Sequence, residues 1–189
     1  MKKILVIDAH PNENSLCYSL AESYSKGARD KGYEVKKLRL ADLQFNPNLR
    51  YGYQKRTDLE PDLLEALKLL KWADHLVWVH PVWWSALPAI AKGFIDRLFL
   101  PRLTYETIPN STRVKGLLSG KSAEIIATLD QPGWFYKLYF KAPSENQLKQ
   151  SLKLCGIKTK RVKYIGPVKN STDAQRKKWL KEVEKLGRM

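Results

Sequence analysis

The chain has 189 residues, with 34 Lys and Arg against 19 Asp and Glu, and a formal net charge of +15. This length suits a single domain with its own hydrophobic core, so we expect one domain spanning residues 1–189. No apolar run approaches the roughly 20 residues that a membrane span needs, and the N-terminus lacks a signal-peptide core. Two cysteines, Cys17 and Cys155, provide no disulfide framework, and we expect a cytoplasmic protein that does not span a membrane.

The positive charge is concentrated in the last third of the chain. Residues 134–189 carry 15 Lys and Arg against 4 Asp and Glu, a local net charge of +11. Nucleic-acid binding is one interpretation of such a surface. Because the basic residues are spread through regular segments rather than gathered in a tail, we favour a solvated basic surface and expect no nucleic-acid partner.

The first twenty residues predict a strand, a polar loop and a helix. An apolar strand over residues 4–9 leads into the loop at residues 10–15, and a helix follows over residues 16–31. The first amides of a helix lack intrahelical partners and carry partial positive charge. Ser15 is positioned to cap this helix and to offer its hydroxyl to an oxyanion. We therefore expect this loop to bind the phosphate of a cofactor.

The rest of the chain alternates between further strands and helices. We expect strands over residues 33–40, 75–80, 122–128 and 159–165. We expect helices that begin at Pro61, before Ile90, at a capping box over Ser144–Gln147, and at a second capping box over Thr172–Gln175. Residues 41–58, 101–118 and 129–134 lack a sustained period and are expected to be irregular.

Five strands alternating with five helices predict a flavodoxin-like, doubly wound α/β fold. Its parallel sheet would have the strand order 2-1-3-4-5, with helices on both faces. Ligands of such sheets bind outside the carboxyl ends of the strands, where the strand order reverses. The loops after the first, third and fourth strands should therefore meet, which brings His10 and Pro81 together.

Two of these loops have a composition that suits a planar ligand. Trp83 and Trp84 follow the third strand, and Val82 and Ser85 beside them offer backbone amides. Two adjacent tryptophans of an extended segment do not share one face, which argues against both belonging to the core. The loop from Thr128 to Trp134 would supply amides and polar groups to the opposite edge of the ligand.

Several other kinds of site are disfavoured. His10 and His80 have no acidic partner at a metal-ligand spacing, so we expect no metal site. The sequence has no nucleophile elbow and no GxxxxGK[ST] phosphate loop. An anion loop, an aromatic wall and an amide-lined rim remain, and together they suit a flavin nucleotide whose own chemistry carries the reaction.

At this point the residues resemble a known family. The chain is similar over nearly its whole length to the flavodoxin-fold NAD(P)H:quinone oxidoreductases, the relatives of DT-diaphorase and the modulator of drug activity. Three segments carry the resemblance, namely residues 4–11 with Ser15, residues 81–97 and residues 115–121. The resemblance implies a homodimer with FMN or FAD at the subunit interface.

The resemblance also implies roles for individual residues. His10, Ser15, Leu16 and Cys17 match positions that hold the flavin phosphates. The segment along the isoalloxazine ring matches Pro81, Val82, Trp83, Trp84 and Ser85, and the loop at the pyrimidine edge matches Thr128, Leu129 and Asp130. The implied activity is a two-electron, ping-pong exchange between NAD(P)H and a quinone-like acceptor at one site.

The sequence departs from the family pattern in two places. Cys17 stands where Asn is more usual, and Thr128-Leu129-Asp130 replaces a Thr-Gly-Gly loop. The Tyr and His that assist hydride transfer in related enzymes have no clear match, so we nominate Trp84 and Tyr136 for that position. An alternative is a flavin-binding accessory subunit of a cation-efflux transporter, with weak turnover and the basic C-terminal third as its docking face.

Overall fold

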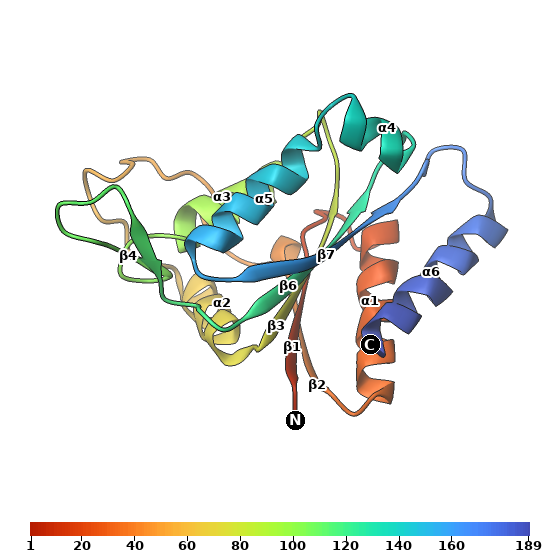
Figure 1. The fold of residues 1–189 in the computed structure, drawn as a ribbon, viewed down its shortest axis with the longest axis horizontal. Coiled ribbons are helices and arrows are strands. Elements are labelled where there is room, and N and C mark those ends of the chain that lie inside the picture. The colour runs from red at the N-terminus through yellow and green to blue at the C-terminus, as the bar shows by residue number, and fades with distance from the viewer.

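A five-stranded parallel sheet in the order β2-β1-β3-β6-β7 forms the centre of the computed structural model, which describes residues 1–189 (Figure 1). Its strands are Lys3–Asp8 (β1), Glu34–Arg39 (β2), His75–Pro81 (β3), Ser122–Thr128 (β6) and Lys158–Ile165 (β7). Every residue of β3 and β6 is buried. Most of their residues are apolar, without the alternation of a half-exposed strand, because helices cover both faces of the sheet.

Helices cover the sheet in two layers (Figure 1). Leu16–Asp30 (α1) and Asp173–Gly187 (α6) lie on one face. The other face is covered by Pro61–Trp72 (α2), Ala89–Leu98 (α3) and Pro143–Leu154 (α5). A short 3₁₀ turn, Leu40–Asp42 (η1), follows β2. None of the helices is both long enough and apolar enough to cross a membrane.

The two layers differ in how closely their helices approach. At Gly27 of α1, an added Cβ would lie 1.9 Å from the backbone oxygen of Glu184 in α6. Only a residue without a side chain permits this contact, so the α1–α6 pair is packed backbone against backbone. This close packing anchors α1, whose N-terminus carries the expected phosphate loop.

Two short elements lie in segments that we expected to be irregular. Tyr105–Thr107 (β4) and Val114–Gly116 (β5) form an antiparallel hairpin outside the main sheet. Gly133–Leu138 (α4) forms one short helix after β6. Three or six residues are too few to establish a strand or helix period, which is why the sequence pattern did not predict them. Because β4 and β5 intervene, the fourth and fifth members of the sheet are β6 and β7.

One of the two expected capping boxes is wrong. Helix α5 begins at Pro143 after Ala142, whose backbone is left-handed, with φ 47°, and which makes no side-chain cap. Ser144 therefore lies inside the helix, and its hydroxyl pairs with the hydroxyl of Tyr136 at 2.8 Å. The second box is confirmed, because the Thr172 side chain accepts from the Gln175 amide while Gln175 accepts from the Thr172 amide.

Candidate cofactor site

A cavity of about 310 Å³ lies at the carboxyl ends of β1, β3 and β6, where their three exit loops meet. All the residues expected to bind the cofactor line this cavity, except Trp84 and Ser85. Its lining consists of His10, Asn12, Ser15, Leu16, Cys17, Pro81, Val82, Trp83, Thr128, Leu129, Asp130 and Val168. The sheet order thus brings together three segments that lie far apart in the sequence.

The loop after β1 is held by hydrogen bonds between near neighbours. The amide of His10 donates to Asp8 Oδ1 at 3.1 Å, and the amide of Asn12 donates to His10 Nδ1 at 2.9 Å. The amide of Asn14 donates to Asn12 Oδ1, also at 2.9 Å. These contacts satisfy the loop's own donors locally and fix its course before the helix begins.

The N-terminus of α1 provides the free donors that an anion needs. Ser15 caps the helix, since its Oγ accepts the amide of Tyr18 at 3.1 Å. The amides of Leu16 and Cys17 donate to no acceptor in the chain, and both residues line the cavity. Unpaired first-turn amides at the positive end of a helix dipole form a ready-made oxyanion site.

Substituting Ser15 with Ala is expected to lower the free energy of unfolding by about 1 kcal/mol, because the Tyr18 amide loses its acceptor. Equilibrium unfolding in urea measures this change. Ser23→Ala on the same helix is the matched control, since Ser23 makes no hydrogen bond through its side chain. Equal effects of the two substitutions would contradict a capping role for Ser15.

His10 presents a neutral ring with one defined donor. Because Nδ1 accepts from the Asn12 amide, the ring proton is assigned to Nε2. Partial burial lowers the pKa of His10, which favours the neutral form at physiological pH. The ring packs edge-on against Trp83, with centroids 5.3 Å apart. His10 can therefore donate a hydrogen bond into the site without carrying a charge.

Cys17 and Thr128 connect α1 to the end of β6. The Sγ of Cys17 lies 3.3 Å from Thr128 Oγ1, and burial raises the pKa of the thiol to about 12. Cys17 is therefore a packed thiol and not a nucleophile. The amide of Val82 donates to the Thr128 carbonyl at 2.8 Å. The expectation that the Val82 amide faces a ligand is wrong, because that donor joins the loops after β3 and β6.

The two tryptophans after β3 face different surroundings. Trp83 lines the cavity, whereas the Trp84 side chain is fully exposed. Two hydrogen bonds between the backbones of Trp83 and Ala86 close a tight turn, with Trp84 and Ser85 left-handed at φ 49° and 61°. The amides of Trp84 and Ser85 have no acceptor in the chain. The turn thus projects one aromatic side chain and two free donors beyond the cavity lining.

Tyr136 holds this turn through a hydrogen bond and does not line the cavity. Its side chain is completely buried, and its hydroxyl donates to the Ser85 carbonyl at 3.3 Å. The same hydroxyl accepts the Ser144 amide at 3.0 Å. The nomination of Tyr136 as a catalytic residue is therefore replaced by a positioning role for the turn at Ser85.

Asn12 and Val168 also line the cavity, and neither was predicted from the sequence as a site residue. Val168 follows β7, and its amide donates to the Leu129 carbonyl at 3.0 Å. Beside it, the Lys169 amide donates to Asp130 Oδ1 at 2.8 Å, so the Asp130 carboxylate is tied to the loop after β7. The signal for Val168 was its place after a strand of the sheet, at the edge where the other loops gather.

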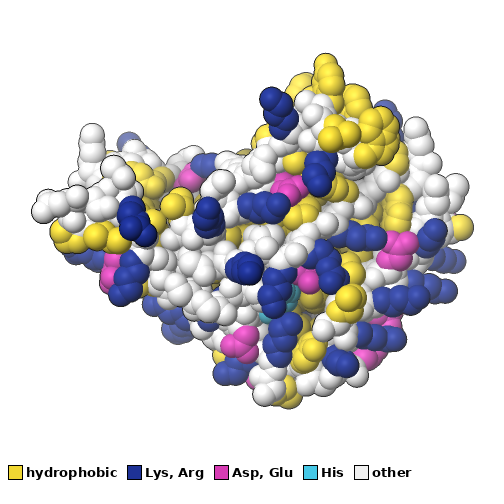
Figure 2. Space-filling model, viewed as in Figure 1, with side chains coloured by type: hydrophobic (Ala, Val, Ile, Leu, Met, Phe, Trp, Pro, Cys, Tyr) yellow, Lys and Arg dark blue, Asp and Glu magenta, His cyan; other side chains and the backbone are white.

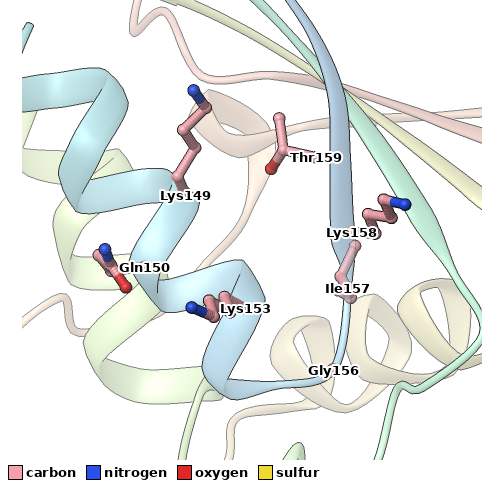
Figure 3. Close-up of a pocket in the computed structure, with 7 residues that line it drawn as sticks. All are labelled: Lys149, Gln150, Lys153, Gly156, Ile157, Lys158 and Thr159. Carbon is pink, nitrogen blue, oxygen red and sulfur yellow. The ribbon is translucent and has the colours of Figure 1, made fainter.

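A larger cavity, of about 460 Å³, lies elsewhere (Figure 3). It opens between the end of α5 and the start of β7, at the end of the sheet opposite the cofactor site. Lys149, Lys153 and Lys158 line it, but their ammonium groups point in different directions. Lys and Arg side chains are spread over this whole side of the molecule (Figure 2), as expected for a solvated basic surface.

A five-stranded parallel sheet in the order β2-β1-β3-β6-β7, with helices on both faces, defines a protein of the flavodoxin-like fold. The chain belongs to the Flavodoxin_2 family, whose model of the flavodoxin-like fold matches residues 2–186. It is 27% identical over 179 residues to an uncharacterized NAD(P)H oxidoreductase of Haemophilus influenzae, covering 92% of this chain and 88% of that protein.

Two other proteins extend the comparison. Smu.1420 of Streptococcus mutans has a crystal structure with a TM-score of 0.86 and 33% identity, covering 98% of both chains. NAD(P)H dehydrogenase [quinone] 1 of Rattus norvegicus is 26% identical over 160 residues. That alignment covers 73% of this chain and 57% of the rat protein, so this chain spans little more than half the length of that relative.

Proposed function

We propose that the chain is a flavin-dependent NAD(P)H oxidoreductase that reduces quinones or similar acceptors by two electrons. The observation that carries this proposal is the pair of unpartnered amides, Leu16 and Cys17, that face a cavity between three loops. The names of the H. influenzae and rat relatives support NAD(P)H as the electron donor, and the name of the rat relative supports a quinone as the electron acceptor.

The residues present fit an FMN or FAD. The amides of Leu16 and Cys17, the Ser15 hydroxyl and His10 Nε2 would hold the phosphate. The free amides of Trp84 and Ser85 would meet the polar rim of the ring, opposite the loop at residues 128–130. When bound, the flavin supplies the two-electron redox chemistry. The chain supplies geometry, hydrogen-bond donors and exclusion of water, and no side chain needs to act as a general base.

We also propose that the protein is a homodimer. Helix α4 and the residues after it expose large apolar side chains, with Trp134, Leu138 and Tyr139 each about 70% exposed, at 67%, 72% and 71%. Hydrophobic side chains gather at the top of the view, over the place of α4 in Figure 1 (Figure 2). Trp84 is also fully exposed. A second subunit would cover this surface and complete the wall of the cofactor site, since exposed apolar patches of this kind mark interaction surfaces.

A visible spectrum of the protein reconstituted with FMN or FAD, followed by anaerobic NADPH, tests the proposed activity. Oxidised-flavin bands that bleach on addition of NADPH, and recover on addition of a quinone, are expected. Bands that persist would overturn the oxidoreductase proposal and favour a flavin-binding accessory role. A protein that stays colourless would overturn flavin binding, and sedimentation of the same sample reports whether it is a dimer.

Ser15→Asp separates the phosphate contact from the helix cap. Aspartate caps helices as well as serine does, so the free energy of unfolding is expected to stay within about 0.5 kcal/mol. Its carboxylate would repel the cofactor phosphate, and flavin affinity is expected to fall by at least about tenfold. Flavin fluorescence titration measures this change. Unchanged affinity would place the phosphate elsewhere.

A further inference from the structure

A second cavity, of about 290 Å³, lies between α1 and the edge strand β2. It is lined by β1, α1, β2 and η1, on the side of β1 that faces α1, and it shares no residue with the cofactor cavity. Its lining combines four hydrophobic residues with charged ones, namely Val6, Asp8, Tyr18, Ala21, Glu22, Lys37, Leu38, Arg39 and Asp42.

One carboxylate oxygen at this cavity has no hydrogen-bond partner. Asp8 is 4% exposed, and its Oδ2 is buried without any donor, while Oδ1 accepts the His10 amide at 3.1 Å. Leaving a buried carboxylate oxygen unpaired is costly, because nothing replaces the water it loses. A donor supplied from the cavity would satisfy this oxygen.

The charges around the cavity select a cation. Lys37 pairs with Glu22 at 2.6 Å, and Arg39 pairs with Asp42 at 2.6 Å and with Glu13 at 3.1 Å. Both basic side chains are thus neutralised by their own partners. The carboxylate of Asp8 is left over, which makes this a locally acidic place in a chain whose net charge is +15.

The walls of the cavity favour a ligand with an apolar body. Val6 and Ala21 supply aliphatic surface, and Tyr18 supplies an aromatic ring. The guanidinium of Arg39 already lies 6.0 Å from the centroid of that ring. A cation beside a phenol ring gains from the ring's negative face in addition to any ion pair.

We propose that this cavity binds a small organic cation, a primary amine with an apolar body, whose ammonium group donates to Asp8 Oδ2. Two contacts join the cavity to the loop after β1, through the His10 amide on Asp8 and through Glu13 on Arg39. An amine bound to Asp8 would therefore contact a residue that holds the loop at residues 10–15, which is the proposed phosphate loop. The site does not depend on flavin binding, because its lining residues are distinct.

The test is an NMR titration of the ¹⁵N-labelled full chain with benzylamine, and with benzyl alcohol as the neutral ligand of similar shape. Benzylamine is expected to give saturable shifts confined to amides of β1, α1, β2, η1 and the loop at residues 10–15. Benzyl alcohol is expected to bind at least about tenfold more weakly, because a neutral hydroxyl does not replace a charge-assisted hydrogen bond.

Asp8→Asn removes the charge with little change of shape. This substitution is expected to weaken the binding of benzylamine by about tenfold or more. Asp96→Asn is the matched control, since Asp96 pairs with Lys92 on α3 and lies outside this cavity. Equal affinity of the Asp8→Asn protein would overturn the proposal. So would equal binding of the alcohol, or shifts that fail to saturate, which would mean that the cavity holds only solvent.

Discussion

Replacing Arg97 with Met is expected to lower the free energy of unfolding by about 3–5 kcal/mol. Arg97 lies on α3 with 1% of its surface exposed, and its guanidinium binds both carboxylate oxygens of Glu60, at 2.8 and 3.0 Å. It also donates to the carbonyls of Asp58, at 3.0 Å, and Asn46. Methionine fills the space but leaves the two carbonyls without the guanidinium donors, and it leaves Glu60 with only the Asn46 amide, at 3.0 Å.

The expected decrease in the free energy of unfolding has a second structural cause besides the ion pair. Residues 43–60 form no strand or α-helix, and Arg97 binds the loop near both of its ends. Equilibrium unfolding in guanidinium chloride measures the change in stability. Lys92→Met in the same helix is the control, because Lys92 and Asp96 form an exposed pair worth less than about 1 kcal/mol. A similar small loss for both variants would show that Arg97 does not anchor the loop.

His80→Leu is expected to stabilise the protein, and the gain is expected to grow as the pH falls. His80 is completely buried, neither ring nitrogen has a hydrogen-bond partner, and burial lowers its pKa to about 4. The unfolded chain binds a proton near pH 6.5 and the folded chain only near pH 4. The free energy of unfolding is therefore highest above pH 6.5, and it falls as the pH is lowered from 6.5 to about 4. The gain of the variant should increase by about 2 kcal/mol between pH 7 and pH 5.

Asp8→Asn provides a control of opposite sign. Burial raises the pKa of Asp8 to about 6 from an ordinary value of 3.8, so the folded chain holds this proton more tightly than the unfolded chain. The ionised Asp8 carboxylate lowers the free energy of unfolding, and this loss is absent below pH 3.8 and complete above pH 6. The increase in the free energy of unfolding on Asp8→Asn should therefore grow as the pH rises. Urea unfolding at pH 5 and pH 7 checks both variants. Parallel pH profiles would contradict the assigned burial of these groups.

The five main strands, and most of the residues that line the cavity at their carboxyl ends, could be predicted from the order of residues. The strand over residues 122–128 was predicted with the bounds that it has in the structure, because Ile125, Ile126 and the alanines beside them form a short apolar core between a polar start and a polar end. The helix cap at Ser15 was equally clear, because it acts through the Tyr18 amide three residues away. Local patterns of this kind are carried by the order of residues alone.

Only the tertiary structure decided which donors and side chains face the site. The Val82 amide is taken by the Thr128 carbonyl, and the Ser144 hydroxyl is taken by Tyr136, so neither keeps the role that its local pattern indicates. Asp8 Oδ2 is buried without a hydrogen-bond partner in the folded chain, which the local sequence around Asp8 does not indicate. In each case the deciding partner belongs to another element, and hydrogen bonding and burial depend on distances that the sequence does not contain.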